Sequence, residues 1–208
     1  MSTHERRSQV WPISAGNLSD ELSSHGYPME MVEIVEAANG QRLTVRPILP
    51  LDAAKFQAFV KNLSDASRSH RFLHGLRELP EHLLHRLTQV DYHTHVALVA
   101  EVLREGMPII IAEARYAIDP ENGSAELAVA VADDWQGLGL AKALLKRLAA
   151  HAAAAGLRRL TGETRASNAR IVQLAQRAGF SIMPVPGIAG LLRLSGNIAS
   201  PPASARVR

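Results

Sequence analysis

Cysteine is absent from this chain of 208 residues, and lysine, aromatic residues and long apolar runs are scarce. Without cysteine the protein can have no disulfide, no thiolate metal ligand and no cysteine nucleophile. Aromatic residues make up 4% of the chain, and the net charge of +3 comes mostly from scattered arginines. A nucleic-acid interface usually gathers its positive charge on one face, beside aromatic side chains or a reading helix. We therefore expect no nucleic-acid partner.

The chain also lacks the sequence features that direct proteins into or across membranes. No apolar run approaches the roughly 18 residues of a membrane-spanning helix. The charged start MSTHERRSQVWPIS contains no apolar core of the kind found in signal peptides. We therefore expect a cytoplasmic protein with no membrane partner.

The composition is that of a globular domain, with 47% hydrophobic and 21% charged residues, and the length favours one domain over two. Residues 1–30 carry serine, glycine, proline and asparagine without apolar periodicity, and 195–208 are small, polar and interrupted by proline. These patterns predict a flexible N-terminal arm over 1–30 and a flexible C-terminal tail over 195–208. The folded domain is expected over 31–194.

Strand and helix patterns alternate along the folded part. The Asn39-Gly40 pair between two β-branched runs is typical of a hairpin turn, and Asp52 is a candidate N-cap. In order, the patterns predict a hairpin over 31–49, helices over 52–62, 65–75 and 80–90, an antiparallel meander over 94–132, a helix over 140–155, and a strand, helix and strand over 157–194. This order predicts a mixed α/β layer, not a repeat protein or a helical bundle.

The most informative segment is the junction where a predicted strand runs into a short glycine-containing loop and then a long helix. The loop consists of Gln136, Gly137, Leu138, Gly139, Leu140 and Ala141. Glycines allow the backbone to approach a ligand closely, and the first N–H groups of the helix point outward with the positive end of its dipole. The loop therefore predicts an anion site suited to a pyrophosphate. Its spacing fits neither GxxxxGK[ST] nor GxGxxG, because Lys142 occupies the place of the last glycine.

This loop resembles the [Q/R]xxGx[G/A] signature of the GNAT superfamily of acetyl-CoA-dependent N-acetyltransferases. Glu126 on the preceding strand, Asn168 and the Gly179-Phe180 pair stand at the spacing that this superfamily shows, and the resemblance covers roughly 43–183. Segments 67–92, 96–101, 112–116 and 125–145 are similar to the GNAT domain of bacterial Pat-type protein lysine acetyltransferases. The resemblance implies an α/β (α+β) fold with a mixed, mostly antiparallel central sheet and helices on both faces.

The resemblance also implies acetyl-CoA as co-substrate, and it assigns the contacts residue by residue. Backbone groups on the strand are expected to pair with the pantetheine arm, loop N–H groups to bind the pyrophosphate, and an asparagine to bind near the pantetheine or cysteamine. The thioester is expected in a slot between the strand over 125–131 and the strand after Leu157. These positions are Val129 and Val131 for the strand, Gln136, Gly137, Leu138, Gly139, Leu140 and Ala141 for the loop, and Asn168.

Catalysis requires a base, because an amine is protonated at neutral pH. Glu126 stands at the position of the catalytic glutamate in the family, and burial beside apolar neighbours is expected to make its carboxylate a stronger base. The family tyrosine that protonates the departing thiolate would fall at position 175, which is Ala175 here. Tyr116, Tyr92 or a water are the alternatives. Because no cysteine can form an acyl-enzyme, we expect direct attack of the amine in a ternary complex.

The acceptor and several surface features leave alternatives open. The acceptor is expected to be a protein lysine, the alternatives being a small amine or a non-catalytic module that only binds acyl-CoA. The pairs His70/His74 and His82/His85 lie at helical spacing without an HExxH pattern, so we predict no metal site. Arginines at 68, 71 and 77 line either the acceptor side or a solvated helix face. The terminal segments either mediate a homodimer or are flexible.

Overall fold

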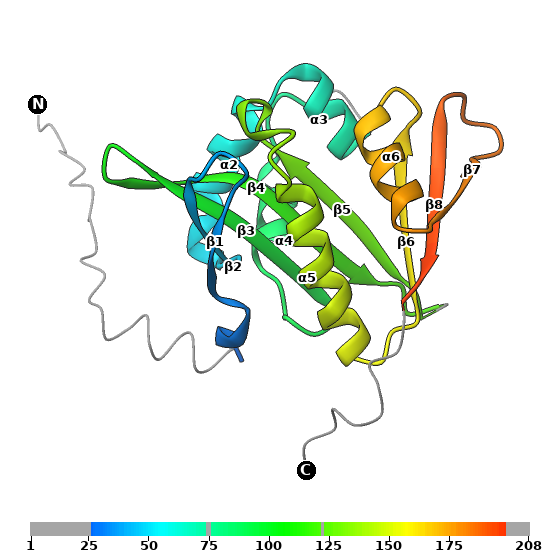
Figure 1. Cartoon of the computed structure of the whole chain (residues 1–208), viewed down its shortest axis with the longest axis horizontal. Helices are drawn as coiled ribbons and strands as arrows, with labels where there is room; N and C mark the ends of the chain where they lie inside the picture. The colour runs from blue at the N-terminus through cyan, green and yellow to red at the C-terminus, as the bar shows by residue number, and fades with distance from the viewer. Residues whose placement is uncertain (1–25, 74–75, 122, 199–208) are drawn as a thin grey trace, which may run out of the picture.

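In the computed structural model, which describes residues 26–73, 76–121 and 123–198, an eight-stranded sheet runs in the order β1-β2-β3-β4-β5-β6-β8-β7 (Figure 1). The strands are β1 (Glu33–Glu36), β2 (Arg42–Pro47), β3 (His95–Arg104), β4 (Met107–Ile118), β5 (Ala125–Val131), β6 (Arg159–Arg165), β7 (Ser181–Pro184) and β8 (Leu191–Asn197). The helices are α2 (Ala53–Asn62), α3 (Asp65–Phe72), α4 (Glu81–Thr88), α5 (Leu140–Ala154) and α6 (Ala169–Arg177), with short 3-10 turns at Met29–Met31, Pro50–Asp52 and Asp133–Trp135.

Neighbouring strands are antiparallel throughout the sheet except where β5 meets β6. The predicted hairpin is present, with Gly40 at φ 81°, a conformation that glycine adopts without a steric penalty. The meander also forms as predicted, as β3, β4 and β5. The expectation of a mixed, mostly antiparallel sheet is thus confirmed.

Helices cover both faces of the sheet, as predicted. In Figure 1, α5 and α6 lie in front of the sheet, and α2 and α4 lie behind it. The front core contains Leu144 and Leu148 of α5, packed against Leu98 and Tyr116 of the sheet. The rear core contains residues of α2 and α4 packed against alternate residues of the same strands, such as Val99. Period-2 alternation along β3 and β4 therefore supplies both cores.

The structure differs from the sequence predictions at the borders of elements. Asp52 precedes α2 but makes no capping bond to it; its carboxylate instead accepts from the Leu49 N–H at 2.8 Å and from the Arg46 guanidinium. Strand β8 extends to Asn197, three residues beyond the predicted end of the domain at 194. Tyr27, inside the predicted arm, donates a hydrogen bond to the Pro47 carbonyl at 3.0 Å. The remainder of the predicted arm and tail, 1–25 and 199–208, lies outside the described residues.

None of the helices described is both long enough and apolar enough to cross a bilayer.

Candidate functional site

Strands β5 and β6 separate almost as soon as they meet. Their parallel pairing is limited to Ala125 with Leu160 and Glu126 with Thr161. Because β5 stays in regular register with β4 along its whole length, and β6 pairs with β8 along its whole length, the sheet opens between two well-supported strands. The predicted slot between these strands is therefore present, and its apex lies at the Glu126–Thr161 pair.

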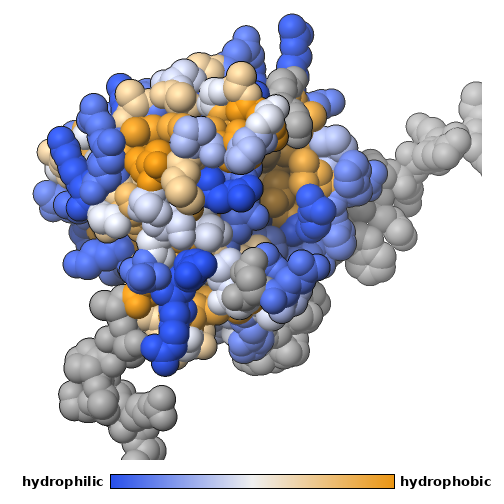
Figure 2. All heavy atoms as spheres, turned by 90° about the vertical axis from the view of Figure 1, so that its right-hand side faces the viewer, coloured by the Kyte–Doolittle hydropathy of each residue, from blue (hydrophilic) through white to orange (hydrophobic). Residues whose placement is uncertain are grey.

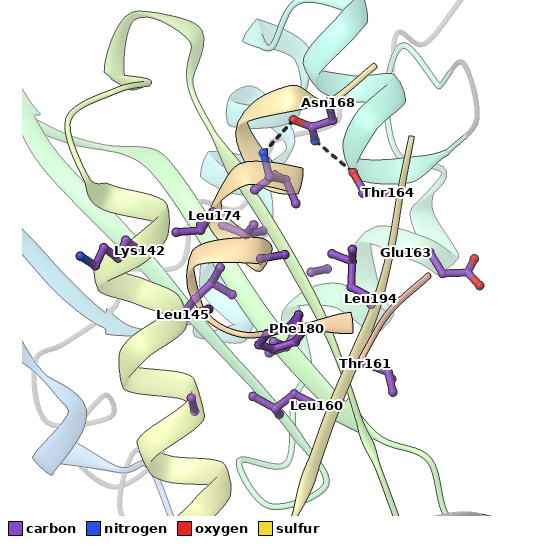
Figure 3. Close-up of a pocket in the computed structure, with 18 of the residues that line it drawn as sticks. Lys142, Leu145, Leu160, Thr161, Glu163, Thr164, Asn168, Leu174, Phe180 and Leu194 are labelled. Carbon is purple, nitrogen blue, oxygen red and sulfur yellow. Dashed lines mark hydrogen bonds between the residues drawn. The ribbon is translucent and has the colours of Figure 1, made fainter. Parts of the chain in front are cut away.

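Two cavities follow this slot. The first, of about 430 Å³, lies between β5, β6, α5 and α6 (Figure 3), and the second, of about 350 Å³, lies at the start of α5. Seven residues line both cavities, which makes them one continuous groove: His70, Val129, Lys142, Asn168, Ile171, Leu174 and Arg177. On the side of the molecule that carries α6, β7 and β8, Figure 2 shows apolar residues between hydrophilic ones.

The backbone of β5 presents hydrogen-bonding groups to the slot. The Ala132 N–H donates to Ile111 on the β4 side at 2.8 Å, whereas the Val131 carbonyl, on the opposite edge, accepts from Gln136 Nε2 at 3.1 Å. Alternate residues of a strand direct their backbone groups to opposite edges, so Val129 faces the slot as Val131 does. Both residues line the second cavity. An extended ligand lying beside β5 would meet the edge of β5 that is not paired with β6.

The glycine-containing loop surrounds the second cavity. Gly137 and Gly139 have φ of 81° and 85°, which glycine adopts readily, and Gly139 is the N-cap of α5 without any capping side chain. The first N–H groups of the helix are therefore available to an anion. Of the six predicted residues, Leu138 alone does not line the cavity: it packs against the front core, and its carbonyl accepts from Ala38 N–H at 3.4 Å. The other five line it: Gln136, Gly137, Gly139, Leu140 and Ala141.

Positive charge surrounds this part of the groove. Lys142 of α5 and Arg170 and Arg177 of α6 line the second cavity, Lys146 lines the first, and the first turn of α5 contains no acidic residue. Arg170 also donates to Gln136 Oε1, so Gln136 connects the end of β5 to α6. The charge and the free N–H groups together suit a phosphorylated ligand.

Asn168 lines both cavities, but its side chain has structural partners. Its Oδ1 caps α6 by accepting from the Ile171 N–H at 3.4 Å, and its Nδ2 donates to Thr164 Oγ1 at 3.2 Å (Figure 3). These bonds fix the start of α6 beside the slot.

Helix α3 crosses the open end of the slot on the rear face. At one end, Ser64 and Ser67 donate to Asp133 just after β5, each at 2.7 Å through the hydroxyl. At the other end, Arg165 of β6 donates to the Leu73 carbonyl at 2.7 Å, and His70 Nε2 lies 3.2 Å from Ser167 Oγ. Helix α3 thus connects the two diverging strands and brings His70 into both cavities.

His70 belongs to one of the two histidine pairs for which the sequence predicts no metal site. Burial, and then the charge of Arg165, lower the pKa of His70, which favours a neutral imidazole at neutral pH. Its predicted pair partner, His74, lies outside the described residues. Within the part of the chain that is described, no group of three or more His, Asp or Glu side chains could hold a metal ion.

A buried ion-pair network fixes Arg71 at the wall of the first cavity. Glu113 of β4, fully buried, accepts from Arg71 at 3.1 and 3.3 Å and also from Arg115. Burial alone would raise the pKa of Glu113, but Arg115 and Arg71 lower it to about 2, so this carboxylate stays ionised. Among the three arginines considered from the sequence, Arg71 lines the groove. The sequence gives no signal for this role of Glu113, because its pattern is that of an ordinary strand residue. The contact with Arg71 depends on where α3 packs.

Glu126 lies at the apex of the slot, but its surroundings differ from the prediction. The expectation that apolar neighbours bury it is wrong: the side chain is exposed, and it lines neither cavity. The reason is strand alternation, since Ala125 and Leu127 pack with the front core and Glu126 points to the opposite face.

The tyrosines considered as proton donors are not in the groove. Tyr116 is buried against α5 with its hydroxyl 2.8 Å from His151 Nδ1, and Tyr92 donates to the Ile48 carbonyl at 2.7 Å. Burial raises the pKa of each to about 12. Neither lines a cavity, whereas Ala175, at the family's tyrosine position, lines the first one.

Comparison with known proteins identifies a family and relatives that are similar to this chain. The model of the acetyltransferase (GNAT) family matches residues 60–180. The chain is 34% identical to the acetyltransferase PA5475 of Pseudomonas aeruginosa over 142 residues, which is 68% of this chain and 76% of that protein. It is 29% identical to the acetyltransferase Pat of Mycolicibacterium smegmatis over 147 residues, which is 70% of this chain but 43% of Pat. The chain thus spans less than half the length of Pat.

A solved structure is also similar over most of the chain. The crystal structure of the GNAT domain of S. lividans PAT superposes with a TM-score of 0.73 at 31% identity. The superposition covers 82% of this chain and 99% of that domain.

The buried network predicts a pH-dependent loss of stability in Glu113→Gln. Removing the carboxylate leaves Arg71 and Arg115 without their anionic partner, so the free energy of unfolding should fall by about 3 kcal/mol near neutral pH. Because the folded-state pKa of about 2 lies below the ordinary 4.5, the carboxylate's contribution is complete above pH 4.5 and is lost as the pH falls toward 2. Urea unfolding at several pH values should show the gap between variant and wild type narrowing in acid.

Glu163→Gln is the matched control for this measurement. Glu163 pairs with Arg193 in a half-exposed position, and such pairs contribute less than about 1 kcal/mol. Equal losses in the two variants, or a gap for Glu113→Gln that widens in acid, would contradict the account of the network.

Proposed function

Because the chain belongs to the acetyltransferase (GNAT) family, whose members use acetyl-CoA as co-substrate, we propose that it transfers the acetyl group to the amine of a protein lysine. The family membership confirms the enzyme class and the co-substrate expected from the sequence. The observation that carries the proposal is the slot between β5 and β6, which runs from the loop before α5 to an apex where Glu126 faces solvent. A lysine on the surface of another protein can reach an exposed apex. The resemblance of the sequence to the GNAT domain of bacterial Pat-type protein lysine acetyltransferases favours this acceptor class, and the chain is 31% identical to the GNAT domain of S. lividans PAT.

In this proposal acetyl-CoA lies along the groove with its charged end at the loop. The pyrophosphate binds the N–H groups of the loop and of the first turn of α5, and the three cationic side chains that line the second cavity neutralise its charge. The pantetheine arm lies beside β5, pairs with the slot-facing backbone groups of Val129, and passes Val131 and Asn168. Gln136 acts on the ligand indirectly, since its amide already bonds the Val131 carbonyl and Arg170.

The reaction then needs one base and one proton donor. Glu126 takes a proton from the acceptor ammonium, and the neutral amine attacks the thioester carbonyl carbon. A C–N bond forms and the C–S bond breaks; the attacking nitrogen releases its second proton to water, and the coenzyme A thiolate takes up a proton from water. The bonded, buried tyrosines are unsuited to that last step, whereas solvent reaches the groove directly. The amine attacks acetyl-CoA itself, in a ternary complex.

The role of Glu126 predicts that Glu126→Gln separates turnover from binding. The amide keeps the size of the side chain but cannot accept the proton, so turnover should fall by roughly 10²–10⁴ while the dissociation constant of acetyl-CoA is unchanged. Thiol release and calorimetry measure the two quantities. Glu121→Gln, an exposed glutamate in the preceding turn, is the control, and near-normal turnover in Glu126→Gln would remove the assignment.

The loop predicts a contrast between two glycines with the same backbone conformation. Gly139 and Gly156 both have φ 85°, and a Cβ at either position meets nothing within 4 Å. Alanine should therefore destabilise the fold by a similar amount at both, about 1 kcal/mol. Gly139→Ala should in addition weaken acetyl-CoA binding at least fivefold, because the loop changes shape next to the pyrophosphate, whereas Gly156→Ala should not. Equal affinities in the two variants would argue against the pyrophosphate site.

The acceptor is tested by measuring free-thiol release from acetyl-CoA with three kinds of amine. We expect transfer to lysines of folded proteins and lysine peptides to exceed transfer to polyamines, and mass spectrometry should find a mass increase on lysine. Faster transfer to polyamines would establish a small-amine acceptor instead. A thermal shift with acetyl-CoA but no turnover with any amine would indicate a binding module.

A further inference from the structure

The first cavity contains a cluster of apolar side chains near the apex of the slot, and charged residues such as Lys146 and Glu163 line the same cavity. We call this cluster the apolar end and define it by six residues: Leu145 and Ala149 of α5, Leu160 of β6, Ala175 and Ala178 around the end of α6, and Phe180. None of the six lines the second cavity. The apolar end therefore belongs to the part of the groove that the first cavity does not share with the cavity at the loop.

The direction of the groove places the apolar end next to the reacting carbon, given the function proposed above. The phosphates bind at the second cavity, and the arm passes the shared residues Val129 and Asn168. Thr161, which belongs to the apex pair, and Leu127, which follows Glu126, line the first cavity together with the apolar end. An acyl group delivered to the apex thus has the apolar end beside it.

Small side chains keep this region open. Ala149 on α5 and Ala175 on α6 both line it, and each contributes only a methyl group. Figure 3 shows Leu145, Leu160 and Phe180 gathered between α5, α6 and β6, while Lys142 and Glu163 point away. An acetyl group brings a single methyl to this region, whereas a short hydrocarbon chain would extend farther along its apolar side chains and remove more apolar surface from water.

We propose that the protein also transfers longer straight-chain acyl groups, of three to about five carbons, whose tails bind in the apolar end. The step is the same as for acetyl: the base takes a proton from the ammonium, the neutral amine nitrogen bonds the carbonyl carbon, and the C–S bond breaks. The nitrogen releases its second proton to water, and coenzyme A leaves as the thiolate and is protonated by water. This inference rests on the proposed function, because it needs the thioester at the apex.

The test is a chain-length series of acetyl-, propionyl- and butyryl-CoA, with calorimetric binding and thiol release measured on the full chain with one lysine peptide. Each methylene buried in the apolar end should tighten binding by about fourfold. We expect kcat/KM for butyryl-CoA to equal or exceed that for acetyl-CoA in the wild type. A tenfold or larger fall in kcat/KM at each added methylene would overturn the proposal.

Two variants that fill the apolar end, and one control variant, test whether the acyl tail binds there. Ala149→Leu and Ala175→Leu should lower the ratio of butyryl to acetyl affinity at least tenfold, because the leucine occupies the volume of the tail. Ala150→Leu places the same side chain on the exposed face of α5, outside both cavities, and should leave the ratio unchanged. The ratio is taken within each variant, so a general loss of stability does not imitate the result.

Each outcome separates this inference from the proposed function. If acetyl is transferred, butyryl is not, and the filling variants leave the affinity ratio unchanged, the inference fails and the proposed function stands. If no acyl-CoA, acetyl-CoA included, supports transfer to any amine, the proposed function fails, and the affinity series alone decides whether the apolar end binds acyl tails. If all three variants change the ratio equally, the tail binds elsewhere and the inference is wrong.

Discussion

The separation of β6 from β5 after two residue pairs is the constraint on which the site depends. A strand in the middle of a sheet normally has partners on both edges, and unpaired backbone groups in a protein interior are costly. Here β5 is fully paired to β4 and β6 to β8, so both strands are stable without each other. The edge of β5 that faces the slot is left to bind an extended ligand.

Two helices on opposite faces complete the groove that this separation begins. On the front face, α5 starts at Gly139 directly after the loop and therefore directs its free N–H groups into the second cavity. On the rear face, α3 connects the ends of β5 and β6 through Asp133 and Arg165. The fully buried Glu113 fixes Arg71 in that helix at the cavity wall. A lone buried carboxylate would be unfavourable, and two arginines are what allow this one to remain ionised.

The groove changes character along its length in the same way as an acyl-CoA does. At the loop it is cationic and has free N–H groups, along β5 it presents backbone amides, and near the apex it contains a cluster of apolar side chains. Glu126 stands apart from the groove on the solvent side of the apex. In the proposed reaction the acceptor therefore approaches from the solvent side, and the thioester approaches from the groove.

The local parts of this arrangement could be predicted from the sequence. The hairpin at Asn39-Gly40, the meander and the loop at Gln136–Ala141 depend on residues close together in the chain, where positive φ at glycine and the first turn of a helix are decided by neighbours. The surroundings of side chains could not be predicted in the same way. Which face of β5 carries Glu126, that Glu113 meets Arg71 at a separation of 42 residues, and that Ala149 and Ala175 face one cavity all depend on how distant segments pack. Burial and charge pairing are properties of that packing, so they were decided only by the tertiary structure.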